Sequence, residues 1–244
     1  MLEIRPLSCY SMAGRPLPRA DAGHDAVNRA LNHAGCNYAG RRIIIGTIEI
    51  MSKLSPQLAA ETDPAWAGYI LEHFDAFLID HANCERKASA LAMSFVIKYA
   101  DRTRIIPPLI ALAQEELVHF QQVYEVMIAR GLQLAPDQKD PYVNALLALC
   151  HSGRERRFLD RLLVSSLVET RGAERFRLIH LALDDPELKS FYRTLWACEA
   201  KHGNQFAEMA LEYFPPEQVS ERLGELVARE AEIVASLPWR PSLH

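Results

Sequence analysis

The 244-residue sequence lacks any apolar run long enough to cross a membrane, since charged residues break each run before the roughly 18 residues that a spanning helix needs. Its opening lacks the apolar core of a secretory signal peptide. Its five cysteines form no CxxC pair, which argues against a zinc ribbon and against a disulfide scaffold. These absences predict a reduced, cytoplasmic protein that does not enter a membrane.

The chain also lacks a strong charge of either sign. Its formal net charge of −4 argues against a protein that coats nucleic acid non-specifically, although a local basic face remains compatible with it. The charged fraction of 24% is ordinary, and the apolar fraction of 49% is enough for one substantial core. Composition therefore predicts a soluble globular protein and leaves its function open.

Residues 1–50 differ in character from the rest of the chain. They mix Gly, Pro, Arg and Asn with little periodicity, and only residues 41–50 (RRIIIGTIEI) resemble a strand. Met51 then opens MSKLSPQL, which is typical of a protein start, and helical patterns follow almost without interruption. We therefore expect residues 1–50 to be a disordered tail or an over-extended reading frame, followed by one domain over residues 51–244.

Helix boundaries after Met51 are marked by capping residues. Asp63-Pro64, Asp140-Pro141 and Asp185-Pro186 each place an N-cap acceptor before a proline at the first helical position. Together with the apolar periodicity, these signals predict long helices within residues 64–100, 105–130, 154–183 and 186–214, a short helix at 141–150 and a last helix at 216–236.

The lengths of the connections predict how these helices are arranged. The first and second long helices, and likewise the third and fourth, are joined by only a few residues, so each pair should form an antiparallel hairpin. About twenty residues with a short helix of their own link the two hairpins. The predicted fold is therefore all-α, a ferritin-like four-helix bundle with one long crossover and extra short helices.

Each of the four long helices carries a glutamate in the middle of its apolar face. Buried carboxylates without partners cost several kcal/mol each and repel one another, and no lysine or arginine shares these faces. In the second and fourth helices a histidine follows the glutamate at i+3, on the same side of the helix. One glutamate from each of two helices plus Glu-x-x-His from the other two is the ligand set of a di-iron or di-manganese site. The predicted metal ligands are Glu85, Glu116, His119, Glu169, Glu199 and His202.

The spacing of these residues is an independent signal for the same site. The interval from Glu116 to Glu199 equals the interval from His119 to His202, and the interval from Glu85 to Glu169 is longer by a single position. The two hairpins are therefore pseudo-repeats with the metals between them. Glu174 is a weaker candidate than Glu169, because it lies about 140° further around its helix and breaks the spacing.

Two further residues are candidates for contacts around the ligands. Glu115 directly precedes a predicted ligand, so it either orients a ligand histidine or is a solvated charge on the flank of the helix. His81 lies one turn before Glu85 on the same face. A hydrogen-bonded core histidine is favoured over a ligand there, because six ligands already suffice.

Several arginines are candidates for a surface that binds RNA phosphates. Arg102 and Arg104 lie in the turn between the first two long helices, and Arg171 and Arg175 point away from the Glu169 face of the third. Solvated helix faces with acidic neighbours explain the same pattern equally well.

Four segments resemble the MiaE-type tRNA hydroxylases: LIDHANCERKASALA around Glu85, QEELVHF around Glu116, VETRGAERF around Glu169 and ACEAKHGNQF around Glu199. The resemblance covers roughly residues 64–214 and includes all six predicted ligands, while residues 1–50 have no counterpart in the family pattern. It implies hydroxylation of the isopentenyl side chain of 2-methylthio-N6-isopentenyladenosine, next to the anticodon in tRNA. Two iron ions, O₂ and electrons from an external donor, either an electron-transfer protein or a reductase, would be required.

Two other functions are compatible with parts of this pattern. A ferritin-like protein that stores iron or scavenges peroxide would share the ligands, but it should form a large shell or carry a CxxC module, which this chain lacks. A nucleic-acid-binding bundle with degenerate ligands disagrees with the intact set of six.

Overall fold

The computed structural model describes residues 56–244, which form seven α-helices and contain no β-strand, so the all-α prediction is confirmed for this part of the chain. The predicted tail and the strand-like residues 41–50 lie outside the described residues. The helices are α3 (Ala65–Glu72), α4 (Phe74–Lys98), α5 (Ile106–Ala129), α6 (Pro141–Ala148), α7 (Arg154–Ala182), α8 (Pro186–Leu211) and α9 (Pro216–Ser236).

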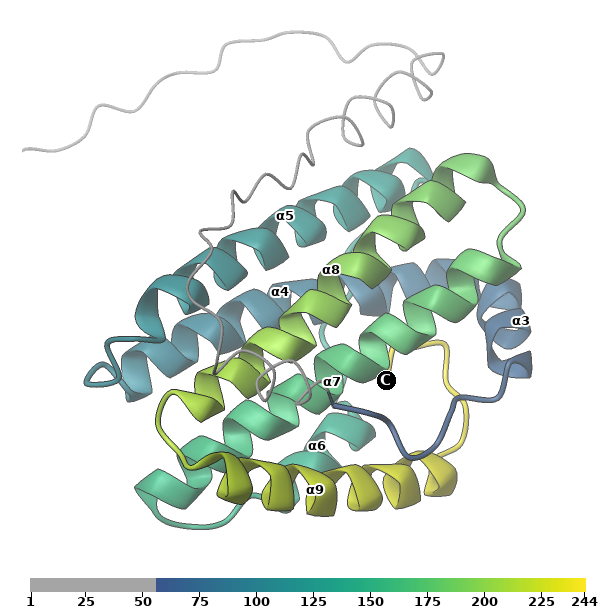
Figure 1. Cartoon of the computed structure of the whole chain (residues 1–244). Helices are drawn as coiled ribbons and strands as arrows, with labels where there is room; N and C mark the ends of the chain where they lie inside the picture. Colours follow the sequence, from purple (N-terminus) through teal and green to yellow (C-terminus); the bar gives the residue numbers. More distant parts are fainter. Residues whose placement is uncertain (1–55) are drawn as a thin grey trace, which may run out of the picture.

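Two antiparallel hairpins make up the bundle. α4 packs against α5 and α7 packs against α8, and the four helices run side by side along one axis (Figure 1). The crossover from α5 to α7 contains α6, whose N-cap residue Asp140 accepts a hydrogen bond from the Val143 amide at 3.1 Å. The predicted ferritin-like connectivity, two hairpins joined by one long crossover, is confirmed.

The first predicted helix is interrupted. Residues 64–100 form two helices, α3 and α4, separated at His73, where φ is −121° and ψ is 30°. The His73 amide donates to the Ile70 carbonyl at 3.0 Å, a tight closing turn that ends α3. The break turns α3 towards α7, where Trp66 and Ile70 are fully buried. Burial of these side chains therefore overrides the continuous helical pattern of the sequence.

The two helices of the second hairpin approach closely because of one glycine. A Cβ atom on Gly203 of α8 would lie only 2.6 Å from Thr170 Oγ1 and 3.2 Å from the Ser166 carbonyl of α7. Ser166 Oγ instead donates to the Gly203 carbonyl at 2.6 Å. The two hairpins do not approach each other as closely as α7 approaches α8. The wider space between the hairpins is where the predicted ligands meet.

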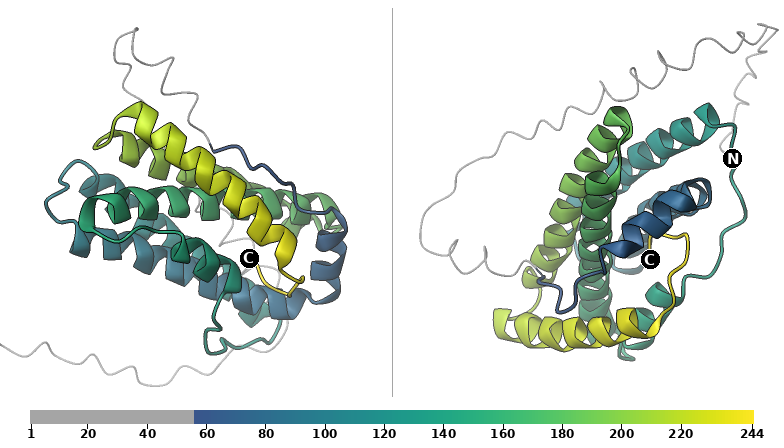
Figure 2. Two further views of the ribbon diagram at one scale, coloured as in Figure 1. Left: turned by 90° about the horizontal axis from the view of Figure 1, so that it is seen from below. Right: turned by 90° about the vertical axis from the view of Figure 1, so that its right-hand side faces the viewer.

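α9 lies along the outside of α6 and α7, and the chain then returns past the end of α3 towards α4 (Figures 1 and 2). A buried ion pair fixes α9 in this position: Arg171 Nε of α7 donates to Glu230 Oε1 at 2.8 Å, and both side chains are fully buried. The returning segment is attached to α4, because the Leu243 amide donates to Asp80 Oδ2 at 2.8 Å. The C-terminal residues consequently become part of the wall around the centre of the bundle.

Candidate metal centre

The structure brings all six predicted ligands together in the core. They form two overlapping groups, in each of which one ligand atom per residue lies within 4.8 Å of all the others. Every member is buried. The first group consists of Glu85, Glu116, His119 and Glu199, and the second of Glu116, Glu169, Glu199 and His202.

The overlap follows the pseudo-repeat of the sequence. Glu116 and Glu199 belong to both groups, whereas each of the other residues belongs to one. One glutamate from each of two helices and Glu-x-x-His from each of the other two is a donor set that would hold a pair of metal ions. The donor set thus fits two cations better than one.

The donor atoms converge, but two of the buried carboxylate oxygens have no hydrogen-bond partner. His202 Nδ1 lies 2.7 Å from Glu116 Oε1, yet this oxygen and Glu199 Oε1 have no hydrogen-bond partner although both are buried. His119 Nδ1 lies 3.3 Å from Glu116 Oε2 and 3.4 Å from Glu199 Oε1. Buried carboxylate oxygens are rarely left unpaired. Unpartnered oxygens facing two imidazole nitrogens are the donors that a bound cation would satisfy.

The electrostatics of two of the four glutamates also favour a bound cation, whereas for Glu85 and Glu199 burial is outweighed by contacts with histidines, which lower their pKa values. Burial, reinforced by the nearby charge of Glu199, raises the pKa of Glu116 to about 7. The same two causes, in the same order, raise the pKa of Glu169 well above its usual range. Two carboxyl groups therefore resist ionisation in the core as it stands. Divalent cations between the hairpins would remove this resistance.

The outer nitrogen of each ligand histidine has its own partner. His202 Nε2 lies 3.0 Å from Glu115 Oε2, and Lys201 Nζ donates to the same carboxylate at 3.0 Å. The hydrogen bond with His202, which is only partly offset by burial, lowers the pKa of Glu115 to about 2. Glu115 thus holds the His202 ring with Nδ1 directed at the cluster, the orienting role that the sequence left open for it.

A sulfur atom takes the corresponding position beside the other histidine. Burial lowers the pKa of His119, but a contact with Cys198 and contacts with three carboxylates outweigh it, so that the pKa lies well above its usual value. Sequence reasoning missed Cys198. The repeat contained the signal, because the interval from Glu115 to Cys198 equals the interval from Glu116 to Glu199.

His81 contacts the predicted ligand Glu85 and is buried where α4 packs against the second hairpin, with the centre of its ring 4.7 Å from the centre of the Phe176 ring. Its Nε2 atom lies 2.6 Å from Glu85 Oε1, and its Nδ1 atom lies 3.2 Å from the Tyr192 hydroxyl. Both ring nitrogens are therefore already used. His81 is therefore the hydrogen-bonded core histidine that the sequence favoured, and its Nε2 atom orients the carboxylate of Glu85.

The structure contradicts the RNA-binding prediction for Arg171 and Arg175. Arg171 is fully buried and pairs with Glu230 and Glu174, while Arg175 is 8% exposed and donates to the Leu243 carbonyl at 2.6 Å. The faces that point away from Glu169 are covered by α9 and the C-terminal segment, so these guanidinium groups cannot reach phosphates. Glu174 is likewise engaged, because the Thr62 amide donates to it at 2.6 Å.

Arg102 and Arg104 do lie at the surface, at one end of the bundle. Arg104 Nη1 pairs with Glu212 at 3.1 Å, and its side chain is 69% exposed. Arg102 pairs with Glu155 and its guanidinium group lies 5.0 Å from the centre of the Tyr213 ring. Both are partnered on the protein, and their contact with RNA stays a prediction.

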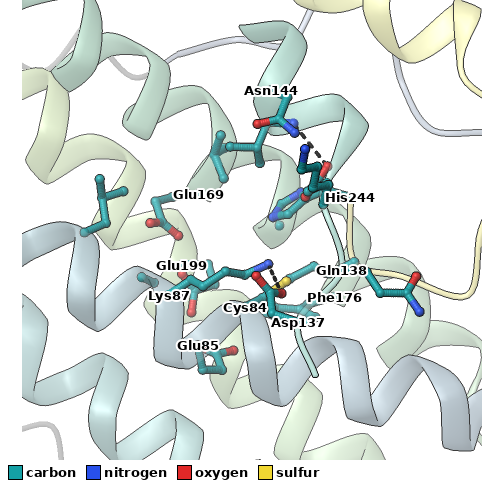
Figure 3. A pocket seen from close by; sticks show the side chains of 18 residues that line it. Cys84, Glu85, Lys87, Asp137, Gln138, Asn144, Glu169, Phe176, Glu199 and His244 are labelled. Carbon is teal, nitrogen blue, oxygen red and sulfur yellow. Dashed lines mark hydrogen bonds and ion pairs between the residues drawn. The ribbon is translucent and has the colours of Figure 1, made fainter. Parts of the chain in front are cut away.

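A cavity of about 350 Å³ leads from the surface to the carboxylate side of the cluster. Glu85, Glu169 and Glu199 line its inner part, as the close view shows (Figure 3). Its walls come from α4, α7, the crossover segment around residues 137–144 and the C-terminal residues. The arrangement combines a metal-binding donor set with space for a small organic group.

Comparison with known proteins identifies the family. Residues 49–244 match the sequence profile of the family described as tRNA-(MS[2]IO[6]A)-hydroxylase (MiaE). The chain belongs to this family. A MiaE relative, the tRNA 2-(methylsulfanyl)-N(6)-isopentenyladenosine(37) hydroxylase of Pseudomonas putida (strain KT2440), is 34% identical over 190 residues, which are 78% of this chain and 92% of the relative.

Two further proteins are similar to this chain. The hydroxylase of the same name from Salmonella typhimurium (strain LT2) is 24% identical over 249 residues, covering 82% of this chain and 92% of that protein. A solved structure, protein 43 with aldehyde deformylating oxygenase activity from Synechococcus, has a TM-score of 0.73 and 35% identity, covering 77% of this chain and 94% of that one. Among the described helices of the present chain, none is both long and apolar enough to cross a membrane.

Proposed function

We propose that this protein hydroxylates the isopentenyl side chain of 2-methylthio-N6-isopentenyladenosine in tRNA. The observation that carries the proposal is the pair of overlapping ligand groups at the inner end of a cavity, in a chain of the MiaE family. The ligand residues Glu85, Glu116, His119, Glu169, Glu199 and His202 would hold two iron ions.

The donor set suits iron in this role. Carboxylates are hard, anionic ligands, and imidazole is a good ligand for iron as well as for other transition metals. Bound iron would supply the chemistry that side chains lack, the reduction of O₂ and the oxidation of a C–H bond of the side chain. The overall reaction is balanced when an external donor provides two electrons and two protons, so that one oxygen atom enters the product and the other leaves as water.

The protein's own groups hold the ions and shape the space around them. Glu116 and Glu199, which belong to both ligand groups, would hold the ions together with Glu85 and Glu169, and three of these carboxylates, Glu85, Glu169 and Glu199, also line the cavity. Glu115 fixes the ring of His202 through Nε2, which leaves Nδ1 as the ligand atom. The substrate side chain would then reach the carboxylate side of the centre.

The proposed substrate also defines the partners and the location. The modified adenosine of the anticodon loop lies in a single-stranded region whose bases can be splayed out and bound individually. An electron-transfer protein or reductase is the expected source of electrons, and the cytoplasm is the expected compartment. Arg102 and Arg104 are retained as candidate contacts to the RNA backbone.

The decisive test is nucleoside analysis of tRNA from cells that lack this protein. Loss of the hydroxylated nucleoside with accumulation of its unhydroxylated precursor is expected, and an unchanged profile would contradict the proposed substrate. The purified protein tests the metal site separately. We expect Glu116→Ala to lose both iron and hydroxylation, because Glu116 belongs to both ligand groups. Full iron occupancy in that variant would contradict the ligand assignment.

A further inference from the structure

The cavity beside the candidate metal centre reaches it from the side of its carboxylates. Its inner part is lined by Glu85, Glu169 and Glu199, and neither ligand histidine is among the described residues that line it. His202 Nδ1 instead lies 2.7 Å from Glu116, which is not a lining residue either, and His202 Nε2 lies 3.0 Å from Glu115. A molecule that enters the cavity therefore meets the carboxylates of the centre, between α4 and α7.

Much of the cavity lining is apolar. These lining residues are Ala88 and Leu91 of α4, Val143 of α6, and Val168, Gly172 and Phe176 of α7. The volume of about 350 Å³ is at the lower end of the roughly 300–1,000 Å³ of sites that enclose small ligands. Such a space suits a branched five-carbon chain and the edge of the base that carries it, but not a whole nucleotide.

The outer part of the cavity is polar and positively charged at two points. Lys87 and Lys139 line it, together with Gln138 and Asn144. Lys87 Nζ pairs with Asp137 at 2.9 Å, with side-chain exposures of 37% and 40% (Figure 3). Exposed pairs of this kind contribute little to stability, so a phosphate group can compete for the lysine. The carboxylate of Asp140, also at this rim, is engaged by the Val143 amide.

Gly172 determines how much of the cavity is open. It is buried in the middle of α7, three residues after Glu169 and thus on the same side of the helix. A Cβ atom there would meet nothing closer than His244 Cε1 at 3.8 Å and Leu243 Cδ2 at 4.0 Å. Glycine inside a helix is less stabilising than alanine at the same position. No close contact requires a glycine here, and its effect is to leave the space beside Glu169 empty.

We infer that this cavity is the binding site for the isopentenyl side chain, that Gly172 sets the depth to which the chain enters, and that Lys87 at the rim binds a phosphate of the anticodon loop. The inference rests on the proposed function and specifies where the substrate binds. Lys87, at the mouth of the cavity, thus replaces the buried Arg171 and Arg175 as a candidate contact to RNA.

The test compares Gly172→Leu and Gly172→Ala with Gly224→Leu, which replaces an exposed glycine of α9 that has nothing within 4 Å of its added Cβ. Each variant is assayed for iron content, for tRNA binding and for hydroxylation of tRNA that carries the isopentenyl nucleoside. We expect Gly172→Leu to keep iron and tRNA binding but to lose at least tenfold in hydroxylation, Gly172→Ala to be intermediate, and Gly224→Leu to match the unaltered protein.

An iron-loaded Gly172→Leu variant with full hydroxylation would overturn the inference while leaving the proposed function intact. If Gly172→Leu loses iron, the result for Gly172→Ala tests the inference instead. Reduced hydroxylation by Gly172→Ala at full iron content would support the inference, and unchanged hydroxylation would refute it. If the unaltered protein itself fails to hydroxylate this tRNA, the proposed function and the inference fail together.

The rim is tested with Lys87→Gln, with Arg229→Gln of the exposed face of α9 as the control. We expect Lys87→Gln to raise KM for tRNA by roughly three- to tenfold, to leave kcat nearly unchanged and to flatten the dependence of tRNA binding on salt concentration. Unchanged KM and salt dependence would exclude a phosphate contact at Lys87.

Discussion

His202 Nε2 lies 3.0 Å from Glu115 Oε2, while Nδ1 of the same ring lies 2.7 Å from Glu116 Oε1. Two adjacent glutamates of α5 thus contact opposite sides of one histidine of α8. Glu115 acts on the metal centre through the orientation of the ring, whereas Glu116 is itself a candidate ligand. This division of roles leads to a prediction that separates the two residues.

Glu115→Gln should lower the affinity for iron without abolishing it. The amide keeps a hydrogen bond to His202 within reach but removes the negative charge that makes the imidazole a better donor. Loss of such outer partners typically costs about 10–100-fold in metal affinity. The measurement is an iron titration with a competing chelator. Glu125→Gln, on the same helix and bonded to Gln121, should titrate like the unaltered protein. Equal affinities for both variants would exclude the orienting role of Glu115.

Glu169 and Glu174 should respond oppositely to substitution. Glu169 belongs to the second ligand group, whereas Glu174 accepts hydrogen bonds from Thr62 and from Arg171 Nη1. We expect Glu169→Gln to lose at least half of the bound iron and Glu174→Gln to keep the iron but unfold at lower denaturant concentration. Elemental analysis and urea unfolding measure the two effects. Retention of iron by the first variant together with its loss from the second would reverse the ligand assignment.

Much of the centre could be predicted because its residues obey local rules. Helical periodicity identified four buried glutamates, and the interval that recurs between the two hairpins favoured Glu169 over Glu174. Arg171 and Arg175 could not be placed in the same way, because periodicity shows which side of α7 faces the bundle but not that α9 and the C-terminal segment cover the opposite side. Buried partners distant in sequence, Glu230 and Leu243, decide their positions.

The ion pair between Arg171 and Glu230 provides a prediction about stability. Both side chains are fully buried, and Glu230 also accepts a hydrogen bond from the Tyr142 hydroxyl at 2.9 Å. Removing one partner of a buried ion pair costs about 3–5 kcal/mol, and without Glu230 the buried guanidinium group of Arg171 would keep Glu174 as its carboxylate partner. Glu230→Ala should therefore lower the free energy of unfolding by about this amount. Glu232→Ala, whose partner Arg229 is exposed, should change it by less than about 1 kcal/mol. The free energies of unfolding of both variants are measured by urea unfolding at fixed iron content. Similar small decreases for Glu230→Ala and Glu232→Ala would contradict a stabilising role of the buried ion pair.

Arg175 should control the C-terminal wall of the cavity rather than RNA binding. Its guanidinium group donates to the Leu243 carbonyl at 2.6 Å and lies 5.0 Å from the centre of the Trp66 ring, while Asp80 accepts from the Leu243 amide. Arg175→Met keeps most of the apolar stem but removes the donor. One hydrogen bond from a charged group contributes about 1.5–3 kcal/mol, so amide hydrogen exchange around residue 243 should accelerate roughly tenfold or more. Arg177→Met, on the exposed side of α7, should leave exchange unchanged.

Because Leu243 lines the cavity, the loosened wall in Arg175→Met should also weaken hydroxylation. The salt dependence of tRNA binding should stay as in the unaltered protein. If tRNA binding by Arg175→Met depends less on salt while amide hydrogen exchange at residue 243 is unchanged, Arg175 would instead contact RNA.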